Sequence, residues 1–309
     1  MAKAEIFDIP TKIMKDFNDL SLEERLEFLD SFDIAFCDCD GVIWKTMQET
    51  IPNIGKSIEF LRANNKKIIF VTNNSLRTFP DQIRKFAENH IDVNDDDIIR
   101  PSNAIAAYLN KINFNGIAYV ISNSPFRQDL EEAGINTIHG PNGVVEENFE
   151  DLSKHIFDKE KIGAVIIDID FNLSVTKLIK AHLYLKNENC LFIGGAFDTV
   201  IPFGNTDIVG PGPFISVVEK TTGKKPKIFG KPGHELGELL LEISNDISPN
   251  RVLFIGDHLN SDIKFANHLG FQTLLVFTGA TKRENLSDLT ENDRIPDYIA
   301  DTLVDIIIP

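Results

Sequence analysis

Residues 34–44 read Ile-Ala-Phe-Cys-Asp-Cys-Asp-Gly-Val-Ile-Trp, and the rest of the chain is organised around this stretch. An apolar run ends in Asp38 and Asp40, and this pattern predicts a short buried strand over 34–37 with two acids at its C-terminal end. Ligands of open parallel α/β sheets bind beyond such strand ends. The two acids could hold a hard cation, with one as nucleophile and the other in proton transfer. Alternatively, they only cap the following turn.

The composition is that of a soluble globular protein. Of its 309 residues, 42% are hydrophobic and 25% are charged, a length that suits two ordinary domains or one large one. The formal net charge of −16 argues against nonspecific binding to nucleic acid or to an anionic membrane. Three cysteines do not make a disulfide framework. Because neither a signal sequence nor a long apolar run is visible, we expect a soluble, cytoplasmic protein.

Strand and helix patterns alternate along the first hundred residues. A capping box formed by Ser21 and Glu24 predicts a helix over 22–29. Further on, the patterns predict helix 53–64, strand 67–71 and helix 80–89. This alternation indicates right-handed βαβ units and a doubly wound parallel sheet of the α/β class.

The pattern restarts near residue 101, and we interpret 101–206 as a second α/β unit inserted into the first. Within it we expect helices 102–111, 125–133 and 174–186, strands 116–121, 137–138, 163–169 and 190–194, a polar stretch over 142–151 and a turn-rich segment over 194–213. The first pattern then resumes. It predicts helices 213–222, 235–244 and 261–269, strands 227–229, 251–255 and 272–277, and a last short strand over 297–300.

Polar residues follow three further predicted strands. Thr72 could offer a hydroxyl and backbone N–H groups to an anion at a helix start, and Lys231 a compact positive charge for phosphate oxygens. Asp257, together with Asp38, could supply carboxylates to an octahedral Mg²⁺. Singly, each has a structural alternative as a cap or a solvated turn residue, and we expect Asp262 to support the site or cap a helix. The occurrence of all these residues at strand ends favours a catalytic site over separate structural roles.

Four segments of the chain resemble the motifs of the haloacid dehalogenase (HAD) superfamily. They are Asp38-x-Asp40-Gly41-Val42, Val71-Thr72-Asn73-Asn74-Ser75, Gly230-Lys231-Pro232 and Gly256-Asp257…Ser261-Asp262-Ile263. The chain is most similar to the phosphatases with a large α/β cap, which include 4-nitrophenylphosphatase, phosphoglycolate phosphatase and pyridoxal phosphate phosphatase. The resemblance implies a Rossmann-like HAD core, residues 1–100 and 207–309, and an inserted C2-type cap over 101–206 that sets substrate specificity.

The resemblance also implies a mechanism. Asp38 would attack phosphorus to form an aspartyl-phosphate, and Asp40 would protonate the leaving oxygen and then deprotonate the hydrolytic water. Mg²⁺ would bind the Asp38 carboxylate, the Asp40 backbone carbonyl and Asp257, with Asp262 behind them. Metal and lysine would offset the repulsion between a carboxylate and a phosphate dianion. Dehalogenases of the superfamily lack an acid at the Asp40 position, so its presence favours phosphoryl chemistry.

Substrate binding is implied for residues of the second and third motifs and for one cap histidine. They are Thr72, Asn73, Asn74, Lys231 and His182. Thr72 and Lys231 are implied to be catalytic as well, whereas His182 could equally be structural. The chain departs from its relatives in having Gly195-Ala196-Phe197-Asp198 where the family often has Thr-Asn ahead of the Asp, His258 where it often has Arg, and Asn260 where it often has an acid.

Several alternatives stay open at this level. The substrate could be phosphoglycolate, pyridoxal 5′-phosphate, a glycerol phosphate or a phosphotyrosine in a protein, although a small phosphorylated metabolite is expected. The protein could pass the phosphoryl group to an alcohol, or be a binding or scaffold protein that kept the fold. A homodimer through the cap is implied by the resemblance. Cys37 and Cys39 are either buried strand residues or, on a second hypothesis, sites at which oxidation disables Asp38.

Overall fold

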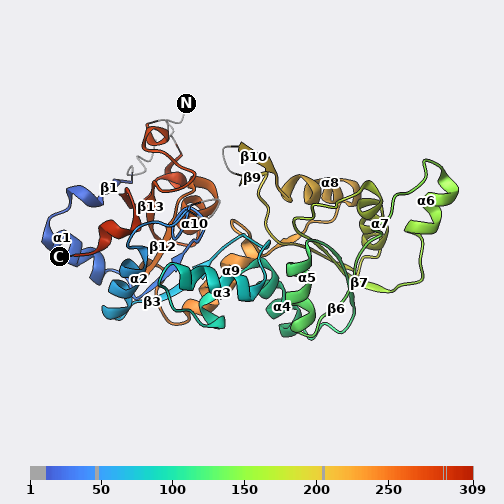
Figure 1. Cartoon of the computed structure of the whole chain (residues 1–309), viewed down its shortest axis with the longest axis horizontal. Coiled ribbons are helices and arrows are strands. Elements are labelled where there is room, and N and C mark those ends of the chain that lie inside the picture. The colour runs from blue at the N-terminus through green and yellow to red at the C-terminus, as the bar shows by residue number, and fades with distance from the viewer. Residues whose placement is uncertain (1–11, 46–48, 204–205, 288, 290, 309) are drawn as a thin grey trace, which may run out of the picture.

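Two parallel sheets form the framework of the protein. The computed structural model describes residues 12–45, 49–203, 206–287, 289 and 291–308. In this part of the chain the first sheet has seven strands in the order β1-β14-β13-β12-β2-β3-β4, and the second has five in the order β11-β8-β7-β5-β6. The two sheets lie in two lobes side by side, with helices packed around each (Figure 1).

The first sheet contains β1 (Lys15–Asp16), β2 (Ile34–Cys37), β3 (Lys67–Val71), β4 (Ile98–Ile99), β12 (Val252–Gly256), β13 (Gln272–Val276) and β14 (Tyr298–Ala300). The second sheet contains β5 (Ile117–Ile121), β6 (Asn136–Ile138), β7 (Ile162–Ile167), β8 (Leu191–Gly194) and β11 (Lys227–Ile228), and β9 (Val200–Phe203) and β10 (Thr206–Val209) form a separate hairpin. The α-helices are α1 (Leu22–Asp30), α2 (Ile54–Ala63), α3 (Phe79–Glu88), α4 (Pro101–Lys111), α5 (Ser124–Glu132), α6 (Phe149–Ile156), α7 (Val175–Leu185), α8 (Gly212–Thr222), α9 (His234–Ser244) and α10 (Phe265–His268).

The strand order reverses at β2, which lies between β3 and β12 in the middle of the first sheet. All four residues of β2 are buried, because a central strand of a parallel sheet is covered on both faces, and this explains its continuous apolar sequence. Phe36 pairs with Ile69 of β3 and with Phe254 of β12. In this register the carboxyl ends of the three strands meet at one edge, where ligands of doubly wound sheets bind.

One apolar cluster connects the two sheets. Buried residues of the first sheet, such as Phe36 and Ile69, and of the second sheet, such as Val120 and Ile166, belong to the same set of packed side chains. Leu240 of α9 is part of this set as well. The second sheet is therefore anchored on the first by continuous hydrophobic packing. In the described residues, no helix is long and apolar enough to cross a membrane.

The predicted strands and helices are found, with three corrections. The segment 194–213 contains the hairpin β9–β10 rather than turns alone, and the polar stretch 142–151 includes the start of α6. The predicted helix 261–269 begins earlier, as a π-helix over Leu259–Lys264 that continues into α10. Two short strands of four residues each are difficult to distinguish from a turn in a sequence rich in Gly and Pro.

The position of β11 is a further correction. We placed strand 227–229 and helix 213–222 in the first unit, but β11 pairs in parallel with β8 of the second sheet, and α8 packs on α7. Gly194 permits this pairing, because a Cβ at this position would lie 2.5 Å from Cδ1 of Ile228. The second sheet therefore extends beyond residue 206. The assignment of separate core and cap roles to the two units stays a prediction.

Candidate active site

Asp38 directly follows β2 and has one bonded and one free carboxylate oxygen. Its Oδ1 accepts a 2.7 Å hydrogen bond from the backbone N–H of Cys39, and Nζ of Lys231 lies 2.8 Å from the same oxygen. The other oxygen has no partner among the described residues. Burial raises the pKa of Asp38, and the nearby carboxylates raise it further against the opposing effect of Lys231. The side chain is thus buried, aligned and available at one oxygen.

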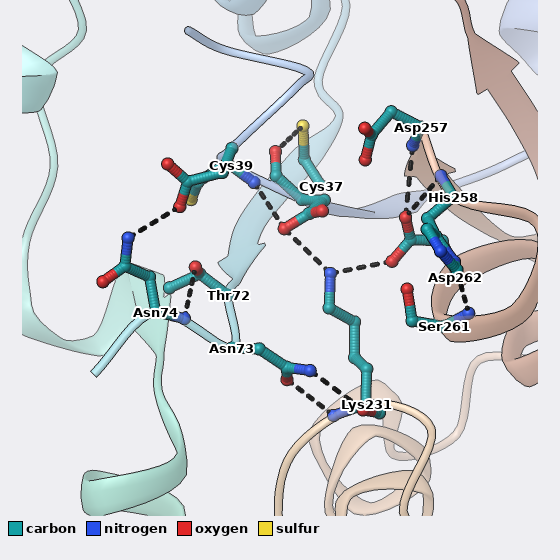
Figure 2. A network of polar contacts seen from close by, with 12 residues as sticks. Cys37, Cys39, Thr72, Asn73, Asn74, Lys231, Asp257, His258, Ser261 and Asp262 are labelled. Carbon is teal, nitrogen blue, oxygen red and sulfur yellow. Dashed lines mark hydrogen bonds and ion pairs between the residues drawn. The ribbon is translucent and has the colours of Figure 1, made fainter. Parts of the chain in front are cut away.

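Lys231 is held between two carboxylates. Its Nζ donates a 2.7 Å hydrogen bond to Oδ1 of Asp262, as Figure 2 shows. Burial acts to lower the pKa of Lys231, but the charges of Asp262 and Asp38 raise it above its usual value, so the side chain stays protonated. The lysine can therefore present a fixed positive charge next to the free oxygen of Asp38.

Asp262 supports the site rather than facing its open side. Its Oδ2 accepts the backbone N–H groups of Asp257, at 3.1 Å, and of His258, at 3.0 Å, while Lys231 occupies the other oxygen (Figure 2). The residue is 0% exposed. A Cβ at position 256 would lie 2.3 Å from Cβ of Asp262, so Gly256 lets the strand end pack against it. Both oxygens are thus engaged, as expected for a supporting acid.

The charges of the site fit a divalent cation. Carboxylate oxygens of Asp38, Asp257 and Asp262 lie within 4.8 Å of one another, and among the described residues Lys231 is the one cation paired with them, contacting Asp38 and Asp262. Burial, followed by the charge of Asp262, raises the pKa of Asp257 to about 7. Buried carboxylates in excess of the available positive charge are costly unless a cation joins them. Oxygen donors of this kind select hard ions such as Mg²⁺.

Asp257 is enclosed by two glycines. A Cβ at Gly41 would lie 2.3 Å, and one at Gly279 1.9 Å, from Oδ2 of Asp257. This oxygen accepts a 2.5 Å hydrogen bond from the backbone N–H of Ala280. Oδ1 has no partner among the described residues, so Asp257, like Asp38, keeps one free oxygen. The carboxylates of Asp38 and Asp257 would hold the cation, Asp257 through its free oxygen.

The second motif positions other parts of the site. Oγ1 of Thr72 accepts the backbone N–H of Asn74 at 3.1 Å. The side-chain amide of Asn73 accepts the backbone N–H of Lys231 at 2.7 Å and donates to its carbonyl at 2.9 Å (Figure 2). It also donates to Asp198 at 2.8 Å. Both ends of this amide are therefore engaged in fixing the Lys231 loop, and direct binding of substrate by Asn73 stays a prediction.

Asp40 is held by two residues of different segments. Its Oδ1 accepts the indole N–H of Trp44 at 2.9 Å, and its Oδ2 accepts the amide N–H of Asn74 at 3.1 Å. A nitrogen of the Arg77 guanidinium lies 3.9 Å from Oδ1. The sequence analysis missed Trp44 and Arg77. The Trp lies in the quoted stretch, but an aromatic residue next to an apolar run indicates a core position equally well.

His182 does not join the other predicted residues. It lies on α7, which packs on β7, α6 and α8 of the second lobe, at a distance from the first sheet (Figure 1). Its contact with substrate stays a prediction. Cys37 and Cys39 are free and buried, and burial and then the charge of Asp38 raise the pKa of both thiols. A disfavoured thiolate argues against regulation by oxidation.

Comparison with known proteins agrees with this geometry. Residues 35–136 match the family model of haloacid dehalogenase-like hydrolases, and residues 228–306 match a HAD-hydrolase-like model. The 4-nitrophenylphosphatase of Schizosaccharomyces pombe is 31% identical over 92% of this chain and 96% of its own length. Phosphoglycolate phosphatase 2 of Arabidopsis thaliana is 33% identical over 93% of this chain and 96% of its own length.

Among solved structures, 4-nitrophenylphosphatase from Thermotoga maritima shares the fold, with a TM-score of 0.73 at 24% identity over 90% of this chain and 97% of its own. The chain therefore belongs to the haloacid dehalogenase-like hydrolases. The curated relatives that match it along nearly their whole length are named as phosphatases. The family, the enzyme class and the parallel α/β fold predicted from the sequence are confirmed.

Proposed function

We propose that the protein hydrolyses small phosphomonoesters through an aspartyl-phosphate on Asp38, with Mg²⁺ as cofactor. The observation that carries the proposal is the free, buried oxygen of Asp38, whose partner oxygen is fixed by Lys231 at 2.8 Å. An oriented carboxylate beside a permanent positive charge can approach a phosphate dianion that a lone carboxylate would repel. The names of the relatives support the same reaction.

The reaction follows in two steps. The free oxygen of Asp38 forms a bond to phosphorus as the bond to the leaving oxygen breaks, and Asp40 gives its proton to that oxygen. Water then attacks phosphorus, Asp40 takes its proton, and the bond to Asp38 breaks to release phosphate. Lys231 offsets charge on the phosphoryl oxygens throughout. Thr72 lies at the end of the neighbouring strand, where its hydroxyl can orient the same oxygens.

The metal would be held by the carboxylates of Asp38 and Asp257 and by the backbone carbonyl of Asp40. When bound, Mg²⁺ supplies positive charge to the phosphoryl oxygens and polarises them. Asp262 has no oxygen left for the ion, since Lys231 and two backbone N–H groups occupy both.

The substrate belongs to the small phosphorylated metabolites, and 4-nitrophenyl phosphate, phosphoglycolate and pyridoxal 5′-phosphate are the first to test. The test is phosphate release from a panel of these esters, with and without Mg²⁺, by wild type and Asp38→Asn. We expect turnover that needs Mg²⁺ and disappears in the variant. Lack of turnover by the folded wild type would favour a scaffold, and a new phosphoester formed with an added alcohol would favour a phosphotransferase.

We further propose that the second sheet and its helices act as a cap over the site, that the protein forms a homodimer through this unit, and that it works in the cytoplasm. The apolar packing between the sheets and the three free cysteines support a stable two-lobed protein of a reducing compartment. Light scattering of the purified protein tests the dimer, and its absence at micromolar concentration would contradict it.

A further inference from the structure

Trp44 is a fully buried aromatic residue whose one hydrogen-bond donor points at the active site. The side chain is 0% exposed, and its indole N–H donates to Oδ1 of Asp40 at 2.9 Å. An indole has one donor and no acceptor. A buried Trp usually finds a partner for this N–H, and a backbone carbonyl would be enough. In this protein the partner is Asp40, the acid that carries out both proton transfers of the proposed reaction.

The Trp44 ring is fixed from several sides. Phe86 of α3 packs edge-on against it with the ring centres 5.1 Å apart. The cationic groups of Arg77 and Lys85 lie 5.8 and 5.5 Å from the ring centre. Lys85 is 6% exposed, and among the described residues its ammonium group has no hydrogen bond or ion pair beside this contact with the ring. Cations against the ring face hold the indole in place and make its N–H a better donor.

The two donors on Asp40 come from two different loops. Trp44 lies in the turn after β2, and Asn74, which donates to Oδ2 at 3.1 Å, lies in the loop after β3. One donor on each oxygen fixes the plane of the carboxylate. The amide oxygen of Asn74 itself accepts the backbone N–H of Leu76 at 3.1 Å, so this clamp is tied to its loop. The direction in which Asp40 can transfer a proton is therefore set by these neighbours.

We propose that Trp44 is a positioning residue for Asp40 and that its indole N–H holds the carboxyl group in the orientation for proton transfer. This inference rests on the proposed function. Oδ1 of Asp40 accepts from the indole and Oδ2 accepts from Asn74, so the orientation in which the carboxyl group gives its proton to the leaving oxygen depends on both donors. When this proton leaves, the bond between phosphorus and the leaving oxygen breaks and the bond to Asp38 forms. In the second step Asp40 takes a proton from water, and Trp44 exchanges none.

The variant Trp44→Phe tests the proposal, since it keeps an aromatic ring and removes the N–H. The measured quantity is kcat/KM for two substrates, 4-nitrophenyl phosphate, whose leaving group needs little protonation, and glycerol phosphate, whose alkoxide needs a proton. General acid catalysis contributes on the order of 10²- to 10⁴-fold, so we expect a loss of roughly 10-fold or more for the alkyl ester and less than about 3-fold for the aryl ester.

Two further variants make the test specific. Phe86→Leu disturbs the packing of the same ring without touching Asp40, and we expect it to leave the ratio of the two kcat/KM values unchanged. In an Asp40→Asn background, Trp44→Phe should no longer change the ratio, because the group it positions cannot transfer a proton. Trp44→Phe is replaced if thermal unfolding shows that it does not fold. Asn74→Ala then removes the other donor, and we expect it to raise the ratio of kcat/KM for the aryl ester to kcat/KM for the alkyl ester, as Trp44→Phe does.

The proposal would be overturned if the folded Trp44→Phe protein lost kcat/KM equally for both esters, or lost none. It would also be overturned if Phe86→Leu changed the ratio of the two kcat/KM values as strongly as Trp44→Phe does. Failure of the proposed function gives a different result, because neither wild type nor the Trp44→Phe variant would then release phosphate from either ester.

Discussion

The two lobes each place a buried aspartate directly after a central parallel strand, and the two differ in how many partners they have. Asp168 follows β7 as Asp38 follows β2, and both are nearly inaccessible to solvent. Oδ1 of Asp168 accepts the hydroxyl of Ser75 at 2.5 Å and the backbone N–H of Ile169 at 2.7 Å, and Oδ2 accepts the N–H of Ala196 at 2.8 Å. No oxygen of Asp168 is free, whereas Asp38 keeps one.

The difference shows that position after a strand does not by itself make a reactive carboxylate. At Asp168 three neutral donors occupy both oxygens, and a Cβ at Gly195 would lie 1.9 Å from Oδ2, so a side chain at position 195 has no room. Because Ser75 belongs to the loop after β3, Asp168 ties the second sheet to the loop that carries Thr72. At Asp38 the carboxylates outnumber the cations, and this imbalance favours a bound cation, as the proposed function requires.

The largest expected effect separates the two aspartates by activity. Asp38→Asn removes the nucleophile, and loss of a covalent nucleophile costs on the order of 10³- to 10⁶-fold in kcat. Asp168→Asn keeps the nucleophile, and we expect turnover within about tenfold of wild type. Phosphate release under saturating substrate measures both, with circular dichroism as the check that each variant is folded. Comparable losses in the two variants would remove the distinction.

The next effect separates two buried lysines. Lys231→Met leaves Asp38 and Asp262 facing each other without a counter-charge, and breaking such a buried pair costs about 3–5 kcal/mol in the free energy of unfolding. We also expect a fall in kcat of roughly 10²- to 10³-fold, typical for loss of one charge-stabilising group.

Lys177→Met is the matched control. Lys177 is 4% exposed and pairs with Asp170 at 2.7 Å in the second lobe. We expect a similar loss of stability in urea unfolding but little change in kcat. If Lys177→Met reduced kcat as strongly as Lys231→Met, the loss in the latter would reflect destabilisation rather than chemistry.

Metal binding gives a third contrast. A ligand that binds only the folded protein stabilises it by about 2.7 kcal/mol at a concentration 100 times its Kd. We therefore expect Mg²⁺ to raise the unfolding temperature of wild type, and this response to disappear in Asp257→Asn, which loses a carboxylate with a free oxygen. Differential scanning fluorimetry over a Mg²⁺ titration measures it. Asp168→Asn should respond as wild type does, and loss of its response would place the metal elsewhere.

The sequence predicts one side of this contrast well. Asp38, Asp257 and Lys231 are recognisable because each follows an apolar strand and the set matches a family pattern. Asp168 also follows an apolar run, and no local signal shows that its oxygens accept hydrogen bonds from Ser75 and Ala196, which are remote in sequence. The positioning of Asp40 by Trp44 and the pairing of β9 with β10 also depend on contacts that no local sequence pattern shows. Strand periodicity places a residue, but its hydrogen-bond partners are set by tertiary packing.

The smallest expected effect concerns the pH dependence of the hydrogen bond between Ser75 and Asp168, which joins the loop after β3 to the second sheet. Burial raises the pKa of Asp168 from 3.8 to about 6, so between these values the folded protein binds a proton more tightly than the unfolded chain. Its contribution to stability is thus fully present below pH 3.8 and declines as pH rises through about 6. Ser75→Ala removes a donor to the ionised form and should raise this pKa further.

We therefore expect Ser75→Ala to lose about 1.5–3 kcal/mol of unfolding free energy at pH 7, the usual effect of a lost hydrogen bond to a charged group, and clearly less at pH 5. Urea unfolding at the two pH values measures the difference, and other titrating groups cancel because both proteins contain them. In an Asp168→Asn background the difference between pH 5 and pH 7 should disappear. Equal losses at both values would mean that Ser75 stabilises the fold by packing and not through the charge of Asp168.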